Sequence, residues 1–374
     1  MGVLQPVAKK ADSRADAFAL QRGCRYHWER QPGSERMHVT LKQVAERAGV
    51  STSAVSRAFT EGASVSSKTR LKVEKAAFDL GYSPNVLASS LTTGRTKMIG
   101  LVSNNFHNPV FLEVFDLFTR GLQAKGLRPL LVNLSDVVDP EGLLRLLRQY
   151  SVDGVIIASS TVPPAFPRAF KGAGIPIVHS FGRYSASQGV HVVGIDNVEC
   201  GRIAARTLAL RGYRRVAFLG GPATATTTQD RWKGFQDELS THPGISVSHS
   251  FAAAYSYDAG QAEMTRLLAD NPAEVYFCGD DVLSIGALSA IRSAGLRVPD
   301  DIGIIGLNDM EMSRWALINL TTIRQPIPEI IAASLDLIVS QIDDPGRSTE
   351  ARIFPCDLVE RGTLRPLPAG VSGT

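Results

Sequence analysis

Apolar residues recur with helical spacing over residues 41–48. This is the first of three short segments between residues 40 and 81 for which a helix is predicted. Its apolar residues stand at positions i, i+3, i+4 and i+7, namely Leu41, Val44, Ala45 and Ala48. Thr40 precedes this run as a candidate N-cap, Gln43 follows as its capping-box partner, and Gly49 ends it. The pattern predicts a helix that buries one face and stops at a sharp turn.

A second helix is predicted directly after this turn, with Ser51 as its cap and Val55 and Phe59 on its buried side. A third helix is predicted over about residues 66–80, ending at Gly81. Two short helices joined by Ala-Gly-Val have the spacing of a helix-turn-helix. The second helix would then expose a polar side made of Thr52, Ser53, Ser56 and Arg57.

From Met98 onward, apolar strand-like runs alternate with helical stretches. The predicted strands include MIGLVS (98–103), PLLVNL (129–134), GVIIAS, IPIVHSF, VVGID, RVAFLGG, VYFCG and IGIIGL (302–307). Helices are predicted over about 109–125, 139–149, 198–211, 230–240 and 282–294. This alternation favours parallel sheets covered by helices on both faces, and its length favours two lobes. Ligands bind beyond the carboxyl ends of such strands, which here carry polar residues.

Charge is distributed unevenly along the 374 residues, whose formal net charge is +4. Residues 37–97 carry nine Lys and Arg against four Asp and Glu, whereas residues 98–374 carry 24 against 28. A basic first quarter attached to a slightly acidic body is typical of a protein that binds a polyanion.

Several classes of function lack support in the sequence. The four cysteines are far apart, which argues against a disulfide framework or a zinc ribbon and favours a reducing cytoplasm. No apolar run reaches the ~18 residues of a membrane span. We find no motif for a dinucleotide, a P-loop or a zinc hydrolase, and Asp280-Asp281 has no further ligand nearby for a metal. We therefore expect no catalytic residues, no metal, no cofactor and no membrane association.

Longer motifs carry a family resemblance. The segments VTLKQVAERAGVSTSAVSRAF (39–59), VSSKTRLKVEKAAFDLGYSPN (65–85) and LASSLTTGRTKMIGLV (87–102) resemble the lactose repressor (LacI) family of bacterial transcription regulators. The resemblance continues through VVGIDNVECGRIAARTL, DRWKGF, CGDDVLSIGALSAI and VPDDIGIIGLND. It implies a helix-turn-helix headpiece and a two-lobe sensor domain similar to periplasmic sugar-binding proteins, built from two doubly wound parallel sheets.

Residues of the headpiece are assigned to DNA contacts on this basis and on their chemistry. Arg57 is a candidate for a bidentate guanine contact, and Thr52 and Ser53 match the positions that set operator preference in the family. Contacts to phosphates are expected from Thr40, Ser51, Lys68, Thr69 and Asn85, with helix capping as the alternative role of Thr40 and Ser51. Tyr82 is interpreted either as a backbone contact or as part of the headpiece core.

The hinge is expected to depend on DNA for its structure. In the family, the segment that matches residues 85–92 folds into a short helix on operator DNA and pairs with its dimer mate. Leu91 matches the leucine that enters the minor groove, and Ala88 is small enough for close approach. The alternative is a disordered linker in which this leucine is incidental.

The resemblance also implies effector contacts in the sensor domain. They are Asn108, Phe111, Phe181, Asp196, Arg231, Asp280, Asp281 and Asp309. Structural alternatives are an ion pair for Arg231, and helix capping or a hydrogen bond at the lobe crossover for Asp196 and Asp309. Phe181 stands where sugar-binding relatives often carry an acid, which disfavours a simple hexose or pentose and favours an aromatic or acid-bearing ligand. Further possible contacts are His107, His179, Arg183 and Trp315.

The sequence therefore predicts a cytoplasmic, homodimeric transcription regulator, most simply a repressor, that binds a pseudo-palindromic double-stranded operator and a small-molecule effector. A periplasmic-type solute-binding protein is the alternative, disfavoured by the basic headpiece and by the lack of a secretory signal pattern. The expected domains are a disordered extension (1–36), the headpiece (37–84), the hinge (85–97), the effector domain (98–368) and a disordered tail (369–374). Lobe 1 is expected over about 98–196 and 323–350, and lobe 2 over about 197–322 and 351–368.

Overall fold

The computed structural model describes residues 39–60, 62–83, 90, 94–134, 139–159, 165–183 and 189–368. The chain divides into two compact units, Met1–Asn85 and Val86–Thr374, and each is described by itself. The predictions for residues 1–36, 369–374, Asn85, Ala88 and Leu91 lie outside the described residues.

The first unit contains three helices, α1 (Leu41–Ala48), α2 (Thr52–Phe59) and α3 (Ser67–Leu80), as the sequence predicts. Thr40 and Gln43 form the expected capping box, because each side chain accepts a hydrogen bond from the other residue's backbone N–H. Gly49 and Gly81 end their helices with φ of 66° and 67°, a conformation that glycine adopts without a Cβ clash. The buried core consists of Val44, Ala45, Val55, Ala58, Val73, Ala76 and Ala77.

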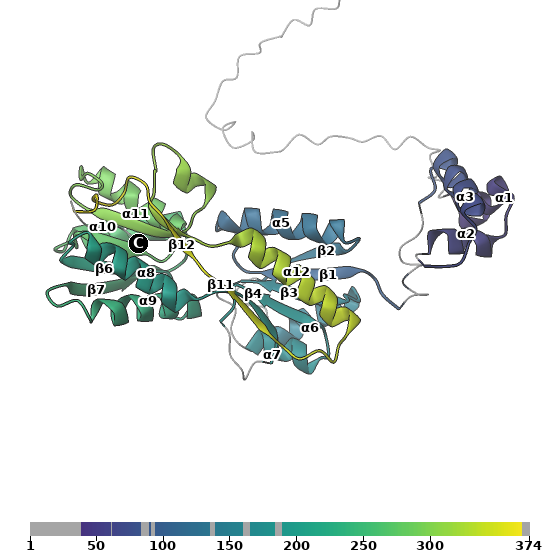
Figure 1. Cartoon of the computed structure of the whole chain (residues 1–374), viewed down its shortest axis with the longest axis horizontal. Coiled ribbons are helices and arrows are strands. Elements are labelled where there is room, and N and C mark those ends of the chain that lie inside the picture. Colours follow the sequence, from purple (N-terminus) through teal and green to yellow (C-terminus); the bar gives the residue numbers. More distant parts are fainter. Residues whose placement is uncertain are drawn as a thin grey trace, which may run out of the picture. The chain divides into compact units, whose positions relative to one another are not determined.

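The second unit contains two sheets, and lobe 1 is built on the first (Figure 1). Its strand order is β11-β5-β4-β3-β1-β2, with parallel pairing throughout. The strands are β1 (Met98–Ser103), β2 (Arg128–Asn133), β3 (Gly154–Ala158), β4 (Ile177–Ser180), β5 (His191–Ile195) and β11 (Ala351–Phe354). Alternate residues of β3 enter two separate cores, so the sheet is covered on both faces. One face is covered by α5 (Val110–Ala124) and α12 (Ile327–Asp343), the other by α6 (Pro140–Gln149) and α7 (Ala165–Gly172).

Lobe 2 repeats this arrangement in the strand order β12-β10-β9-β8-β6-β7, in which only β12 runs antiparallel to its neighbour among the described strands. The strands are β6 (Arg215–Gly220), β7 (Ser246–Phe251), β8 (Val275–Cys278), β9 (Gly303–Asn308), β10 (Thr322–Arg324) and β12 (Asp357–Val359). Its helices are α8 (Asn197–Leu210), α9 (Thr226–Leu239), α10 (Tyr257–Leu268) and α11 (Asp281–Ser293), with the 3-10 helix η2 (Glu311–Arg314) after β9. Two doubly wound lobes agree with the predicted fold class.

Helices α8 and α9 pack with their backbones in close approach. A Cβ on Gly234 would lie 1.8 Å from the carbonyl oxygen of Val198, and one on Gly201 would lie 2.2 Å from that of Arg231. Only glycine fits at these two positions. The two helices therefore form one stiff pair, and the N-terminus of α8 stands at the chain crossover that follows β5.

The structure corrects several predicted boundaries. Strand β10 pairs within the sheet of lobe 2 and β11 within that of lobe 1, so the crossovers lie after residues 324 and 354 rather than after 322 and 350. Helix α9 begins at Thr226, four residues before the predicted start. Among the described residues, no helix is long and apolar enough to cross a lipid bilayer.

Candidate functional site

The exposed side of α2 carries the residues that the sequence assigned to base reading. Thr52, Ser53, Ser56 and Arg57 are exposed, whereas Val55 and Ala58 are buried against α1 and α3. Arg57 lies along its own helix, where its Nε donates to the carbonyl oxygen of Ser53 over 3.3 Å. It makes no ion pair with any described residue, so its guanidinium is available to an acceptor outside the headpiece.

The other headpiece candidates divide between capping and packing. Thr40 and Ser51 cap α1 and α2, which leaves their hydroxyls at helix N-termini, where backbone N–H groups favour anions. Lys68 is exposed, and the Thr69 hydroxyl lies 2.9 Å from that of Ser66. Tyr82 packs on Phe59 with ring centroids 5.9 Å apart, and burial raises the pKa of its phenol. Tyr82 thus belongs to the headpiece core.

A partly enclosed cavity lies between the two lobes of the second unit. The cavity volume, taken as the space open to the centres of water molecules, is about 40 Å³. This is enough for a few waters, because each requires ~10–15 Å³ of such space. Lobe 1 contributes a mainly apolar wall and lobe 2 a mainly polar one. The lining residues are Asn105, Asn108, Val110, Phe111, Val114, Phe181, Ile195, Asn197, Thr227, Arg231, Tyr255, Asp280, Asn308, Gln325 and Ile327.

Arg231 is held rigidly in the polar wall. Its Nε donates to Asn197 Oδ1 over 2.8 Å, and its Nη1 donates to the carbonyl oxygen of Gly279 over 2.6 Å. Its Nη2 makes no hydrogen bond to any described residue, although the side chain is only 6% exposed. One turn earlier on α9, the buried Thr227 Oγ1 has no hydrogen-bond partner among the described residues. Buried polar atoms normally have partners, so the Thr227 hydroxyl can bind a group that enters the cavity, one helical turn from the Arg231 guanidinium.

Asp280 joins this wall from the N-terminus of α11. One carboxylate oxygen caps the helix by accepting from Leu283 N, and the other accepts from Asn108 Nδ2 over 2.7 Å. Burial raises the pKa of Asp280 to about 6, against the opposing effect of these two hydrogen bonds. Asn108 belongs to lobe 1, so this bond crosses between the lobes.

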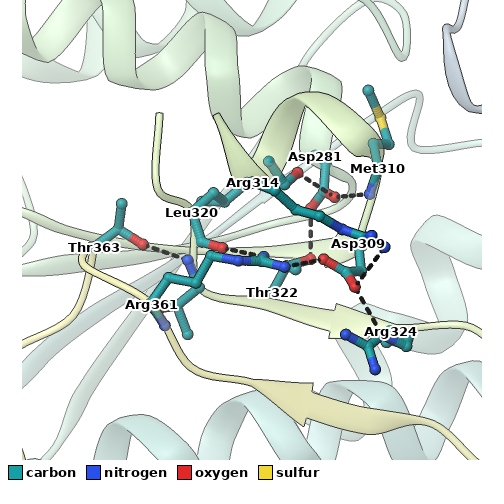
Figure 2. A network of polar contacts seen from close by, with 11 residues as sticks. Asp281, Asp309, Met310, Arg314, Leu320, Thr322, Arg324, Arg361 and Thr363 are labelled. Carbon is teal, nitrogen blue, oxygen red and sulfur yellow. Dashed lines mark hydrogen bonds and ion pairs between the residues drawn. The ribbon is translucent and has the colours of Figure 1, made fainter. Parts of the chain in front are cut away.

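Asp281, assigned to the effector site from the sequence, lies outside the cavity lining. Its fully buried carboxylate accepts from Met310 N over 2.9 Å, Ser313 Oγ over 2.7 Å and Thr322 Oγ1 over 2.5 Å (Figure 2). Burial raises the pKa of Asp281, and these donors oppose that effect. With its oxygens already occupied, Asp281 fixes the segment after β9 rather than a ligand.

Asp309 also lies outside the cavity lining. Figure 2 shows its carboxylate among three arginines, of which Arg324 Nε is 2.7 Å and Arg314 Nη2 3.3 Å from Oδ2, while Arg361 binds Oδ1. Burial alone would raise the pKa of Asp309, but the hydrogen bonds from Arg361 and Arg324 hold it below the usual value. The neighbouring Asn308 lines the cavity instead, and φ is positive at both residues, 132° and 57°.

The remaining sequence candidates are dispersed. Asp196 is exposed and caps α8 by accepting from Glu199 N over 3.0 Å. His179 is bound to the carbonyl oxygen of Ser159, and His107 lines an outer groove of about 870 Å³ that shares Asn105, Asn108 and Tyr255 with the cavity. Trp315 borders a separate groove over α5 and η2.

Phe181 occupies the apolar wall that an acid would have made polar. Its backbone φ is 65°, and its ring meets Phe111 edge to face with centroids 6.0 Å apart.

Sequence reasoning missed Thr227, Tyr255, Asn308 and Gln325. The polar residues at the end of β9 were a signal for Asn308, whereas Tyr255 and Gln325 come from segments without a periodic pattern.

No group of three or more His, Cys, Asp or Glu among the described residues could hold a metal ion. The polar wall instead presents one guanidinium, the hydroxyls of Thr227 and Tyr255, side-chain amides and one carboxyl group as hydrogen-bonding groups. Such a set recognises an organic molecule by its donors and acceptors, and the facing apolar wall covers the rest of it.

Comparison with known proteins finds a matching family or domain for each of the two units. Residues 40–85 match the family described as bacterial regulatory proteins, lacI family, and residues 205–364 match the periplasmic binding protein-like domain. The chain is 30% identical over 336 residues to the HTH-type transcriptional repressor PurR of Erwinia tasmaniensis, covering 88% of this chain and 98% of that protein.

Two solved structures are similar along the same length. The lac repressor dimer bound to operator and the anti-inducer ONPF has a TM-score of 0.77 at 25% identity, covering 87% of this chain and 99% of that one. The transcriptional regulator CelR in complex with cellobiose has a TM-score of 0.64 at 28% identity, with the same coverage. Both the order of the domains and the pairing of the two lobes are therefore shared.

Proposed function

Because the chain belongs to the lacI family of bacterial regulatory proteins, it is a DNA-binding transcription regulator with a ligand-binding sensor domain, and we propose how its residues divide this work. Helix α2 reads the operator, and the interlobe cavity binds the effector. The names of its relatives support repression, and we place the protein in the cytoplasm, where its DNA is.

In the proposed DNA complex, Arg57 donates to a guanine edge in the major groove, and Thr52 and Ser53 contact neighbouring bases. A guanidinium that is exposed and makes no ion pair with a described residue supports this role. Thr40, Ser51, Lys68 and Thr69 set the register through phosphates. Tyr82 supports α2 from within the core.

The roles of Asn85, Ala88 and Leu91 rest on the family resemblance alone, because these residues lie outside the described parts of the chain. A leucine wedge costs a few kcal/mol of unstacking and permits a bend that improves other contacts. An isolated helix of about eight residues is too short to be stable, so its formation would depend on DNA and on the dimer mate.

The observation that carries the effector site is the unpaired hydroxyl of Thr227, buried beside Arg231 in a cavity between two lobes. Leaving such a group without a partner costs about 1–3 kcal/mol, which a ligand hydrogen bond would recover. The pair stands at i and i+4 on α9, so one ligand edge can reach both.

We assign to the effector a polar edge and an apolar face, without a net charge. Arg231 and Asp280 face the same cavity with opposite charge, so a charged ligand that satisfies one is repelled by the other. Phe111, Phe181 and Ile195 require an apolar surface on the opposite side. A sugar with an apolar face or a nucleoside meets both conditions better than a sugar acid.

The homodimer requires a second surface, and we place it over α5 and η2. Leu112, Trp315 and Leu317 are 70%, 53% and 84% exposed, and the first two border a groove of about 960 Å³. Exposed large apolar side chains contributed by both lobes favour a protein partner. The structurally similar lac repressor is a dimer on its operator.

Effector binding would act on the operator through the angle between the lobes. The cavity wall on α9 is locked to α8 by the two glycine contacts, and α8 begins at a crossover. Coupling of about 1–3 kcal/mol would change operator affinity about 5- to 150-fold.

A thermal-shift screen tests the effector proposal. D-ribose, cellobiose, gluconate and nucleosides are added to the wild type and to Thr227→Val, Arg231→Ala and Thr265→Val, the last a matched control on an exposed part of α10. We expect a neutral compound to stabilise the wild type and Thr265→Val but neither cavity variant. Stabilisation by gluconate alone, or equal stabilisation of all four proteins, would reject the proposal.

A further inference from the structure

Arg183 connects the lobes two residues after Phe181, which lines the cavity. It follows β4 in lobe 1, and its side chain reaches α9 in lobe 2. Its Nε donates to Asp230 Oδ2 over 2.8 Å, and its Nη2 lies 2.5 Å from Asp230 Oδ1. The same Nη2 donates to the carbonyl oxygen of Thr226 over 2.8 Å. One guanidinium therefore makes three hydrogen bonds to the first two turns of α9, two to Asp230 and one to Thr226.

The dipole of α9 does not explain why the Arg183 guanidinium lies beside the N-terminus of this helix. A helix N-terminus carries partial positive charge, which disfavours a guanidinium beside its first turn. The N-cap residue of α9, Ala225, makes no capping hydrogen bond with its side chain. The bidentate bond to Asp230 offsets the unfavourable position, and such paired geometry is stronger and more directional than a single contact.

The residues held by Arg183 and the residues that face the cavity form two adjacent stripes on α9. Thr226 and Asp230 stand at i and i+4 toward Arg183, and Thr227 and Arg231 stand at i and i+4 toward the cavity. A helix turns about 100° per residue, so a rotation of one stripe moves the other. The placement of the Arg231 guanidinium thus depends on a residue of the opposite lobe.

We propose that Arg183 is a positioning residue that latches the two lobes through Asp230 and thereby sets the geometry of the effector cavity. This deepens the proposed function and rests on it for the identity of the cavity as the effector site. Asn108–Asp280 is a second bond between the lobes, within the cavity lining. Loss of the Arg183 latch should therefore loosen Asn108 as well as α9.

Hydrogen–deuterium exchange on the full-length protein tests the latch without any ligand. The variants are Arg183→Ala, Asp230→Ala and the charge swap Arg183→Asp/Asp230→Arg. Arg206→Ala is the matched control, because Arg206 is similarly exposed, 43% against 39% for Arg183, and pairs with Glu238 of α9 entirely within lobe 2.

Both single variants should raise exchange about three- to tenfold at the start of α9 and also at the backbone amides of residues 108–111 in lobe 1. The charge swap should restore at least half of the protection, and 1 M NaCl should reduce the difference from wild type. Arg206→Ala should leave residues 108–111 unchanged.

A change confined to α9 would show that Arg183 only supports that helix, and the latch would be wrong. No change, an equal change in Arg206→Ala, or a charge swap without restored protection would also overturn it. The thermal-shift screen is independent of these outcomes, so failure of the effector proposal is recognised separately.

Discussion

The side-chain amide of Asn108 in lobe 1 donates a hydrogen bond of 2.7 Å to the carboxylate of Asp280 in lobe 2, and both residues are buried. Burial raises the pKa of Asp280 to about 6, although Asn108 and Leu283 N both favour its charged form. One of the bonds between the lobes therefore involves a group that titrates close to neutral pH.

This relationship predicts a pH-dependent stability that Asp280→Asn removes. The folded pKa of about 6 lies above the ordinary value of 3.8, so the folded protein retains the proton more strongly. The associated stabilisation is present below about pH 4 and is lost as pH rises through 6, by up to about 3 kcal/mol. Urea unfolding at pH 4 to 7 should show the wild type losing stability relative to Asp280→Asn. A constant difference across this range would contradict the prediction, and Asp237→Asn, on the exposed side of α9, is the control.

Gly234→Ala should separate α8 from α9. The added Cβ would lie 1.8 Å from the carbonyl oxygen of Val198, which the backbone must move to accommodate. We expect a loss of about 1–3 kcal/mol in the free energy of unfolding. Gly172→Ala, where a Cβ meets nothing within 4 Å, should be nearly neutral in the same urea titration. Equal urea midpoints for the two variants would contradict the prediction that the contact between α8 and α9 excludes a side chain at residue 234.

Arg57→Ala should reduce sequence discrimination more than general DNA affinity. Loss of a bidentate base contact costs about 1–3 kcal/mol on the specific site. Competition mobility shifts with specific and random duplexes measure both affinities, and Lys72→Ala on α3 serves as a charge-matched control. A uniform loss on both duplexes would assign Arg57 to the phosphates instead.

Trp315→Asp should weaken the homodimer if the surface over α5 and η2 is the interface. The indole is 53% exposed in the described chain, and an acid in its place could not be buried without a partner. Sedimentation velocity should show at least a tenfold higher dimer dissociation constant. Tyr257→Asp, at an exposed site on α10, should leave it unchanged. A dimer that is equally stable in both variants would place the interface elsewhere.

The sequence was a good guide where one face of an element is buried. The helical spacing of Leu41, Val44 and Ala48 predicted α1, and the capping pair Thr40 and Gln43 fixed its start. Strand β1 was predicted over its full length because parallel strands are buried on both faces and read as continuous apolar runs. No assignment was made for β7, β10, β11, β12, α7, α10 and α12. Strands β10, β11 and β12 have only three or four residues, which are too few for a periodic signal.

The candidate site was predicted by position along the chain more successfully than by side-chain direction. Arg231, Asn108, Phe111, Phe181 and Asp280 line the cavity. In each of the pairs Asp280-Asp281 and Asn308-Asp309, however, one side chain faces the cavity and the other is committed to an internal network. Which member turns inward depends on the local backbone, as the positive φ of Asn308 and Asp309 illustrates, and spacing alone does not contain that information.

The central claim is that a molecule bound between the lobes changes operator affinity. Fluorescence anisotropy tests it, with the full-length protein titrated into a two-fold-symmetric operator obtained by in vitro selection, with and without the compound that stabilises the protein in the thermal-shift screen. We predict a change of about 5- to 150-fold in the operator Kd of the wild type, and no change for Arg231→Ala, which should still bind the operator. An operator affinity that the compound leaves unchanged in the wild type, or changes equally in Arg231→Ala, would contradict the claim.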